Sequence, residues 1–149
     1  SFIDLVRKKT GFTTFDLPTE AQWEYACKAG TQTRRFWGND SNLSENFAWL
    51  RHSIENHAIV GTKLPNPWGF YDMIGNIEEW CLDKYGPYAS FPETDPVGVN
   101  NSAHRILRGG CKATVQMDAS STHRREMKGY FTNEHGSFWF GFRLTLTVD

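Results

Sequence analysis

The sequence predicts a single α+β domain rich in loops, and three observations support this fold class. Its 149 residues are close to the usual size of one domain. One stretch near the N-terminus carries helix start and stop signals, whereas beyond residue 31 short apolar runs alternate with Gly, Pro, Asn and Asp. Residues 138–147 alternate between apolar and polar types, as a β-strand does. We therefore expect about two helices and several short strands in one domain over residues 1–149.

The first helix is expected at the start of the chain, where four apolar residues within 2–6 lie close to helical spacing. Three basic residues follow at 7–9, and Gly11 is a suitable C-terminal cap. Because the pattern begins at once, Ser1 is expected inside a helix, with the natural N-terminus cut off or left out.

The second helix has the clearest local signals in the chain. Thr19 and Gln22 are spaced as a capping box, and Lys28 and Gly30 supply a basic last turn and a stop. These signals predict a helix from Glu20 to Ala29. The apolar residues at 23, 26 and 27 fall on one face, which is expected to pack against the core.

The end of the chain is expected to form a core strand. Phe140, Phe142 and Leu144 alternate with smaller or polar residues across 138–147, so one face of this strand should be buried. The segments between the second helix and this strand should be loops and short strands.

The composition excludes several classes of protein. The net charge is -1 and no block of like charges occurs, which argues against a nucleic-acid partner. The apolar stretches are too short to span a bilayer, so no membrane insertion is expected. Cys27, Cys81 and Cys111 are odd in number and widely spaced, which supports neither a disulfide framework nor a zinc site. The sequence gives no indication of cellular compartment or oligomeric state.

Four segments occur in the order and at the spacing of one known family. They are Leu17-Pro18-Thr19-Glu20-Ala21-Gln22-Trp23-Glu24-Tyr25-Ala26, the stretch 65–80 (PNPWGFYDMIGNIEEW), Arg105-Ile106-Leu107-Arg108-Gly109-Gly110, and Gly141-Phe142-Arg143-Leu144. The sequence therefore resembles the formylglycine-generating-enzyme, or sulfatase-modifying-factor, family. The resemblance implies an elaborated C-type-lectin-like fold from which the N-terminal third of the family domain is missing here.

The resemblance also implies what the site should contain. The family's enzymes oxidise a substrate cysteine with copper held by two thiols shortly after a Gly-Gly-Ser segment. Thr114 and Ala119 stand at the two thiol positions, and Cys111 stands in place of the serine. Copper(I) prefers soft thiolates, so copper is not expected unless Cys81 or Met117 approaches Cys111 in space.

Other pocket positions also differ from the family. Glu78 replaces a tryptophan of the family and Trp139 replaces an asparagine, so the substrate groove is expected to differ from the family's in shape and chemistry. Arg124 lies in the segment that forms the ligand-facing surface in the family. It could bind a carboxylate, sulfate or phosphate in a forked geometry, or it could form a surface salt bridge with Glu126 or Asp118.

A structural calcium site is a further implication of the resemblance. Asn76 and Glu79 belong to the stretch that holds calcium in the family, and calcium requires six to eight oxygen ligands. The alternative is that Asn76 closes a turn and Glu79 pairs with an arginine. Glu78 and Glu79 should point to opposite faces of an extended segment, which argues against a catalytic carboxylate pair.

These residues predict a non-catalytic recognition module. A lectin-like scaffold would present the 111–138 loop surface to a protein, peptide or glycan, as similar domains do in variable proteins. The expected ligand-binding residues are Glu78, Cys111, Thr114, Arg124 and Trp139. The alternative is a formylglycine-generating oxidase, or a related oxidase that uses Cys111.

Overall fold

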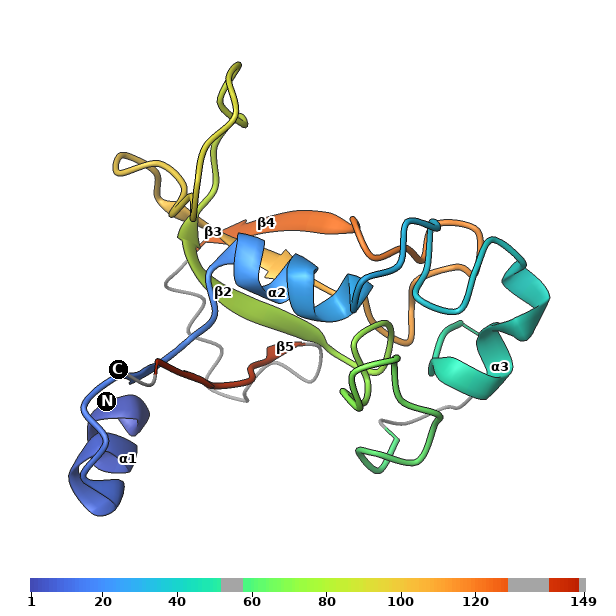
Figure 1. Ribbon diagram of the computed structural model, residues 1–149, viewed down its shortest axis with the longest axis horizontal. Helices are drawn as coiled ribbons and strands as arrows, with labels where there is room; N and C mark the ends of the chain where they lie inside the picture. The colour runs from blue at the N-terminus through green and yellow to red at the C-terminus, as the bar shows by residue number, and fades with distance from the viewer. Residues whose placement is uncertain (52–57, 129–139, 148–149) are drawn as a thin grey trace.

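A four-stranded sheet forms the centre of the computed structural model, which describes residues 1–51, 58–128 and 140–147. The strand order is β4-β3-β2-β5, and all neighbours are antiparallel except the parallel pair β2 and β5 (Figure 1). The strands are β2 (Glu78–Lys84), β3 (His104–Arg108), β4 (Arg124–Lys128) and β5 (Phe140–Gly141). The expected α+β class is confirmed.

Helix α2 (Glu20–Lys28) crosses one face of this sheet (Figure 1). It begins as predicted, because the Thr19 hydroxyl accepts the Gln22 amide and the Gln22 side chain accepts the Thr19 amide. It ends one residue earlier than predicted, since Ala29 adopts a left-handed conformation with φ 47° and serves as the C-terminal cap.

The core lies between α2, the sheet and the long connection from α2 to β2. Trp23 and Cys27 bury the inner face of α2, as the sequence predicted. The remaining buried members of this cluster are Phe36, Ala48, Leu50, Met73, Ile74, Cys81, Ile106 and Ala119. Gly75 fits this region because its φ is 86° and an added Cβ would collide with the carbonyl oxygen of Trp49.

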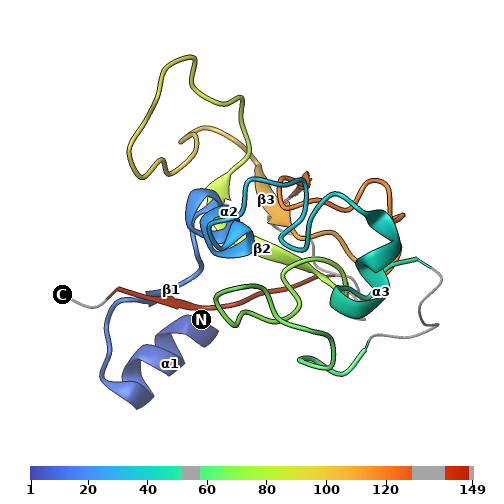
Figure 2. The ribbon, with the colours of Figure 1, turned by 45° about the vertical axis from the view of Figure 1, so that its right-hand side comes forward.

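A second, smaller unit contains the first and last strands of the described residues. β1 (Phe15–Asp16) pairs antiparallel with β6 (Thr145–Leu146), and helix α1 (Phe2–Thr10) packs against β1. Figure 2 shows α1 and this pair standing away from α2. Ser1 is the N-cap of α1 and is not inside the helix, whereas Gly11 is the expected C-terminal cap.

The prediction of one terminal core strand over 138–147 is wrong. Where the structure describes this segment, it forms β5 and β6, which belong to different sheets. Phe142 lies between them with 49 % of its surface exposed and contacts Phe2 of α1 edge to face. The alternation of apolar and polar residues therefore runs on from β5 to β6, although the two strands belong to different sheets.

Two connections carry the remaining features. A short 3-10 helix (Ser41–Leu43) and helix α3 (Ser44–Phe47) lie between α2 and β2. Residues 85–103, here called the arm, join β2 to β3 and project from the sheet (Figures 1 and 2). In the described part of the chain, no helix has the length and apolar character needed to cross a membrane.

Candidate functional site

The predicted site residues that the structure describes gather around one end of the central sheet. Antiparallel pairing brings the start of β2 beside the end of β3 and the start of β4. Glu78 is the first residue of β2, Arg124 is the first residue of β4, and Cys111 follows β3 closely. The amide of Lys112 donates to the carbonyl of Asn76 at 3.0 Å, which ties the segment after β3 to the turn before β2.

Cys111 and Thr114 form a turn that closes on itself. The Thr114 amide donates to the Cys111 carbonyl at 2.8 Å, and the Thr114 hydroxyl accepts the Cys111 amide at 3.0 Å. The carbonyl of Thr114 accepts the amide of Arg51 at 3.0 Å. Thr114, which the family resemblance places at the first thiol position, thus uses its hydroxyl to hold the backbone. A hydroxyl engaged in this way does not fit copper(I).

The three cysteines are free and buried. Burial raises the pKa of Cys27 to about 12, and burial also raises the pKa of Cys81. Ala119, which the resemblance places at the second thiol position, is fully buried and belongs to the core. Met117 is 77 % exposed, whereas Cys111 is buried. These observations favour structural roles for the cysteines.

Glu78 is a buried carboxylate at this end of the sheet. Only 1 % of the residue is exposed, and burial raises its pKa although Arg125 opposes the effect. A guanidinium nitrogen of Arg125 lies 2.9 Å from Oε2 as an ion pair without hydrogen-bond geometry, and His123 Nε2 lies 4.0 Å from Oε1. Burial, with the positive charges of Arg108 and Arg125, lowers the pKa of His123.

Asn76 and Glu79, the predicted calcium ligands, are both committed to protein partners. Glu79 accepts two hydrogen bonds from Arg143, at 2.6 and 2.7 Å, and one from the Trp23 indole at 2.7 Å. The Asn76 side chain exchanges two hydrogen bonds of 3.3 Å with the backbone of Ala58, and its φ is 62°. This donor set does not fit a calcium cage. It fits the alternative in which Asn76 closes a turn and Glu79 pairs with an arginine.

Glu78 and Glu79 point to opposite faces of β2, as predicted. The Glu79 carboxylate contacts Trp23 of α2, on the face of the sheet that the helix covers. The Glu78 carboxylate contacts Arg125 of β4, whose register partner on β3 is Leu107. Among the residues that the structure describes, no group of three or more His, Cys, Asp or Glu side chains is placed to hold a metal ion.

Arg124 is held by α2 and by the base of the arm. Its Nε donates to Glu20 at 2.7 Å and its Nη1 donates to the Gly86 carbonyl at 2.9 Å. Its guanidinium also lies 4.5 Å from the Tyr85 ring and 4.4 Å from the Tyr88 ring. Its ion-pair partner is therefore Glu20, whereas the salt-bridge alternative left open by the sequence named Glu126 or Asp118. Glu126 lies 2.8 Å from His104 instead.

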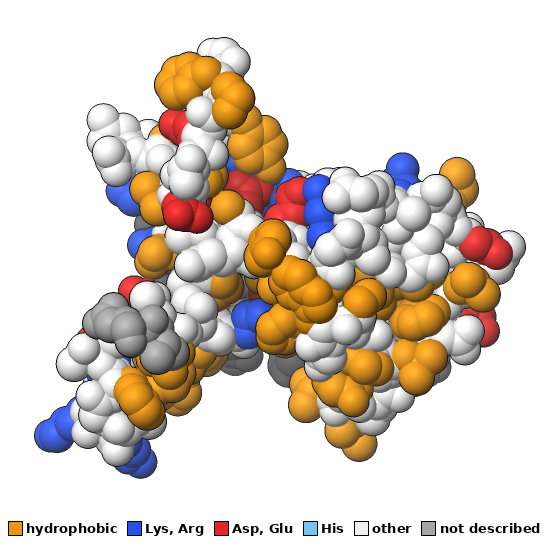
Figure 3. All heavy atoms as spheres, viewed as in Figure 1, with side chains coloured by type: hydrophobic (Ala, Val, Ile, Leu, Met, Phe, Trp, Pro, Cys, Tyr) orange, Lys and Arg blue, Asp and Glu red, His pale blue; other side chains and the backbone are white. Residues whose placement is uncertain are grey.

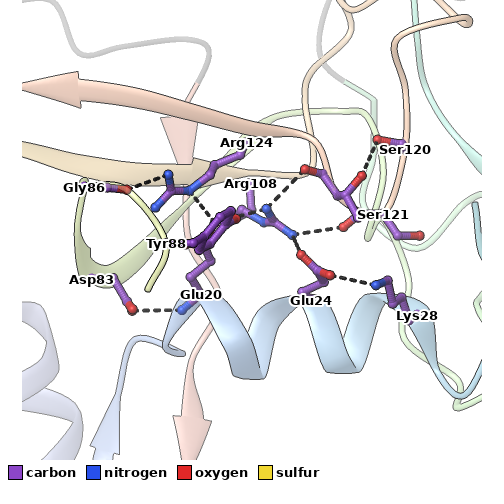
Figure 4. A network of polar contacts seen from close by, with 11 residues as sticks. Glu20, Glu24, Lys28, Asp83, Gly86, Tyr88, Arg108, Ser120, Ser121 and Arg124 are labelled. Carbon is purple, nitrogen blue, oxygen red and sulfur yellow. Dashed lines mark hydrogen bonds and ion pairs between the residues drawn. The ribbon is translucent and has the colours of Figure 1, made fainter. Parts of the chain in front are cut away.

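Sequence reasoning missed the larger network to which Arg124 belongs (Figure 4). Arg108 is fully buried, and its guanidinium donates to Glu20, to Glu24 and to the carbonyls of Ser121 and Thr122. Glu20 and Glu24 are one helical turn apart, so their spacing was a signal for a cation shared along α2. The position of that cation could not be read locally.

Trp139 lies outside the described residues, as does the 129–138 part of the predicted loop surface. The described part of that surface, residues 111–128, includes the Cys111–Thr114 turn and all of β4. Exposed side chains in it include Ala113, Met117 and Asp118.

The chain is similar to known proteins along most of its length. It is 37 % identical over 139 residues to serine/threonine-protein kinase pkn1 of Chlamydia pneumoniae, covering 89 % of this chain and 21 % of the relative. It is 38 % identical over 109 residues to the formylglycine-generating enzyme of Streptomyces coelicolor, covering 63 % of this chain and 35 % of that enzyme. The chain thus spans about a fifth to a third of these two relatives.

A solved structure is similar in both sequence and fold. Treponema denticola variable protein 1 superposes with a TM-score of 0.79 at 32 % identity, over 87 % of this chain and 46 % of that protein. In addition, residues 6–148 match the sulfatase-modifying factor enzyme 1-like domain, and this match includes all four motifs seen in the sequence. The chain therefore belongs to the sulfatase-modifying factor enzyme 1-like family, the family of the formylglycine-generating enzymes.

Proposed function

We propose that this domain is a non-catalytic recognition module that binds a protein, peptide or glycan through the 111–138 surface. One observation carries the proposal. The positions that the family resemblance assigns to the two thiols of the oxidases contain Thr114, whose hydroxyl closes a turn, and the buried Ala119. Copper-dependent oxidation needs two soft ligands at these positions.

The surroundings of this turn support a binding role. Loops on a rigid scaffold are where binding residues usually lie, and the 111–123 connection is fixed at several points. Arg34 donates to the Met117 carbonyl at 2.6 Å, and Arg35 donates to the Gln116 carbonyl at 2.7 Å. The backbone is thereby held while the side chain of Met117 is left exposed. A fixed backbone with free side chains reduces the entropy lost on binding.

The relatives support a scaffold with several uses. One match is a formylglycine-generating enzyme, one is a serine/threonine-protein kinase and one is a variable protein. Because fold does not imply function, the residues of the site must decide between these uses. In this chain they favour binding over oxidation.

The oxidase alternative is tested by incubating the copper-loaded protein and oxygen with a peptide that contains Cys-x-Pro-x-Arg. Mass spectrometry would detect conversion of the peptide cysteine to formylglycine. We expect no conversion, while the Streptomyces coelicolor enzyme assayed in parallel should convert the peptide. Conversion by this chain would overturn the proposal.

The binding role is tested with two probes, a random peptide display library and a glycan array. We expect selective binding to one of them, reduced about tenfold or more by Ala113→Glu or Met117→Glu because both side chains are exposed on the proposed surface. Val60→Glu, at an exposed position outside residues 111–138, should leave binding unchanged. The absence of selective binding on both probes would sink the proposal, and so would equal loss in the control variant.

A further inference from the structure

The arm and helix α2 enclose a cleft of about 840 Å³ that no step of the proposed function uses. Its size is in the range of pockets that hold small organic molecules. The walls include the rings of Tyr25 and Tyr88, both largely exposed, together with Pro87, Pro96 and Val99. Aromatic and apolar walls of this kind pack against the body of a ligand, so they favour an occupant that is partly apolar.

One set of charged groups in the cleft is already paired within the chain (Figure 4). Glu20 accepts hydrogen bonds from Arg108 at 3.1 Å and from Arg124 at 2.7 Å. Glu24 forms ion pairs with Arg108 and Lys28. Because these charges are compensated inside the protein, they hold the floor of the cleft in place and leave the attraction of a ligand to other groups.

Asp83 and Glu93 are the other two carboxylates of the cleft, and neither forms an ion pair within the described residues. Asp83 is 4 % exposed, and one of its oxygens accepts the amide of Glu20 at 2.8 Å. Burial raises the pKa of Asp83, although Arg124 opposes the effect. Glu93 is exposed on the arm. The cleft therefore offers one buried carboxylate and one exposed carboxylate to a cation from outside the chain.

The charge of the cleft disfavours two classes of ligand and favours a third. Its lining carries four carboxylates and two cations, and the buried Arg108 reduces the excess to one negative charge. An anion is repelled by this excess, and a neutral molecule covers Asp83 without supplying a counterion. An ammonium group supplies a positive charge and three donors, and it is attracted to the faces of aromatic rings. Figure 3 shows acidic side chains next to apolar ones where the arm leaves the body of the molecule.

We propose that this cleft binds an organic cation, a primary ammonium group carried on an apolar or aromatic body. The ammonium group pairs with Asp83 of β2, and the exposed Glu93 adds attraction from the arm. The body of the ligand packs against Tyr25 and Tyr88. The inference goes beyond the proposed function, because neither carboxylate belongs to the 111–138 surface.

The probe is 2-phenylethylamine, which is a cation near neutral pH and carries an aromatic body. Its neutral and anionic counterparts are 2-phenylethanol and 3-phenylpropionate. Titrations followed by NMR of the isotope-labelled protein measure the dissociation constants and show which backbone amides shift. The amine should bind at least about tenfold more tightly than the alcohol, and the carboxylate should not bind measurably. The shifted amides should lie in α2, in the arm and around Asp83.

Two variants and a control test the role of the carboxylates. Asp83→Asn removes the charge and keeps an oxygen that can accept the Glu20 amide. It should weaken binding of the amine about tenfold or more and bring its affinity close to that of the alcohol. Glu93→Gln should weaken binding about two- to fivefold, the range for an exposed ion pair. Glu45→Gln removes an exposed charge on α3, outside the cleft, and should leave binding unchanged.

Equal affinities for the amine and the alcohol would overturn the proposal, because the charge would then contribute nothing. Unchanged binding in Asp83→Asn and Glu93→Gln would overturn it as well, and so would the absence of saturable binding of the amine below about 10 mM. Thermal unfolding checks that each variant is folded. If Asp83→Asn is not, Glu93→Gln keeps the test decisive, since position 93 is exposed. These probes differ from those for the 111–138 surface, so either proposal can fail while the other stands.

Discussion

Trp23 on α2 donates its indole N–H to the Glu79 carboxylate of β2 at 2.7 Å, and both residues are buried. The same carboxylate accepts two hydrogen bonds from Arg143. One carboxylate therefore joins α2, the central sheet and the segment between β5 and β6. Replacement of Trp23 removes both a large apolar ring and one donor of this junction.

Trp23→Ala should lower the free energy of unfolding by about 3–5 kcal/mol, because it empties a large volume in the core. Trp23→Phe keeps a six-membered ring but removes the N–H donor and some volume, so it should cost about 1 kcal/mol for the hydrogen bond plus a cavity term smaller than that of Trp23→Ala. Chemical denaturation of the three proteins measures both values. A cost below about 1 kcal/mol for Trp23→Ala would show that this face of α2 contributes little to the core.

Helix α2 was predictable because its signals are local. The Thr19 and Gln22 capping box lies within four residues, and the apolar stripe follows directly. The terminal segment was mispredicted for the opposite reason. Alternation of side chains is the same for one long strand as for β5 and β6, and only long-range pairing with β2 and β1 shows that they belong to different sheets.

The site was predictable in part. Contacts between residues far apart in the sequence could not be predicted. The absence of thiols at Thr114 and Ala119 was inferred from the sequence alone, by their distance from the Gly109-Gly110 motif. The partners of Arg124 and Glu79 could not be inferred in this way, because Glu20 is 104 residues from Arg124 and Arg143 is 64 residues from Glu79. Such ion pairs depend on the assembled fold, so the only salt-bridge partners that the sequence suggested for Arg124 were nearby acids.

Removal of calcium should leave the melting temperature unchanged. Both Glu79 oxygens are engaged by Arg143 and Trp23, so calcium would have to displace them before it could bind. Thermal unfolding with a chelator and with added calcium measures the effect. A melting temperature that falls with chelator and recovers with calcium would restore the site at Asn76 and Glu79 that the family resemblance implies.

Glu79→Gln provides a companion measurement. It breaks the pair with Arg143 and should cost about 3 kcal/mol, the range for removal of one partner from a buried ion pair. The loss should be the same with and without calcium if the carboxylate serves the ion pair. A loss that occurs only when calcium is present would show a ligand role instead.

The pH dependence of stability should reveal the buried carboxyl group of Glu78. Its pKa in the folded protein is raised above the ordinary value of 4.5 by burial, so the folded state binds this proton more tightly than the unfolded state. The stabilisation is complete below the unfolded pKa and is lost as the pH rises through the folded pKa. Glu78→Gln removes this dependence.

The melting temperature of Glu78→Gln, relative to the wild type, should therefore increase as the pH is raised from about 4 to about 7. Arg125 and His123 are the charged and titratable groups beside this carboxyl group, and both are present in each protein. Their contributions largely cancel in the comparison. A relative melting temperature that decreases over this range would mean that the ion pair with Arg125 outweighs burial.

The last prediction concerns Cys111, the residue on which an oxidase mechanism would depend. Its amide closes the turn with Thr114, and only 6 % of the residue is exposed. A reactive thiol must be accessible and partly ionised. Cys27 and Cys81 are also free and buried. We expect no labelling of any of the three thiols in the native state and labelling of all three after unfolding.

Copper(I) titration separates a packed thiol from a metal ligand. Wild type and Cys111→Ser should bind copper(I) equally weakly, because Thr114 and Ala119 supply no second soft ligand beside Cys111. The variant should also melt close to the wild type, since serine is similar in size to cysteine. Rapid native labelling of Cys111 would contradict the packed arrangement. A tight copper site that is lost in Cys111→Ser would contradict the non-catalytic interpretation. It would mean that another ligand approaches this thiol, so that Thr114 and Ala119 do not prevent copper binding.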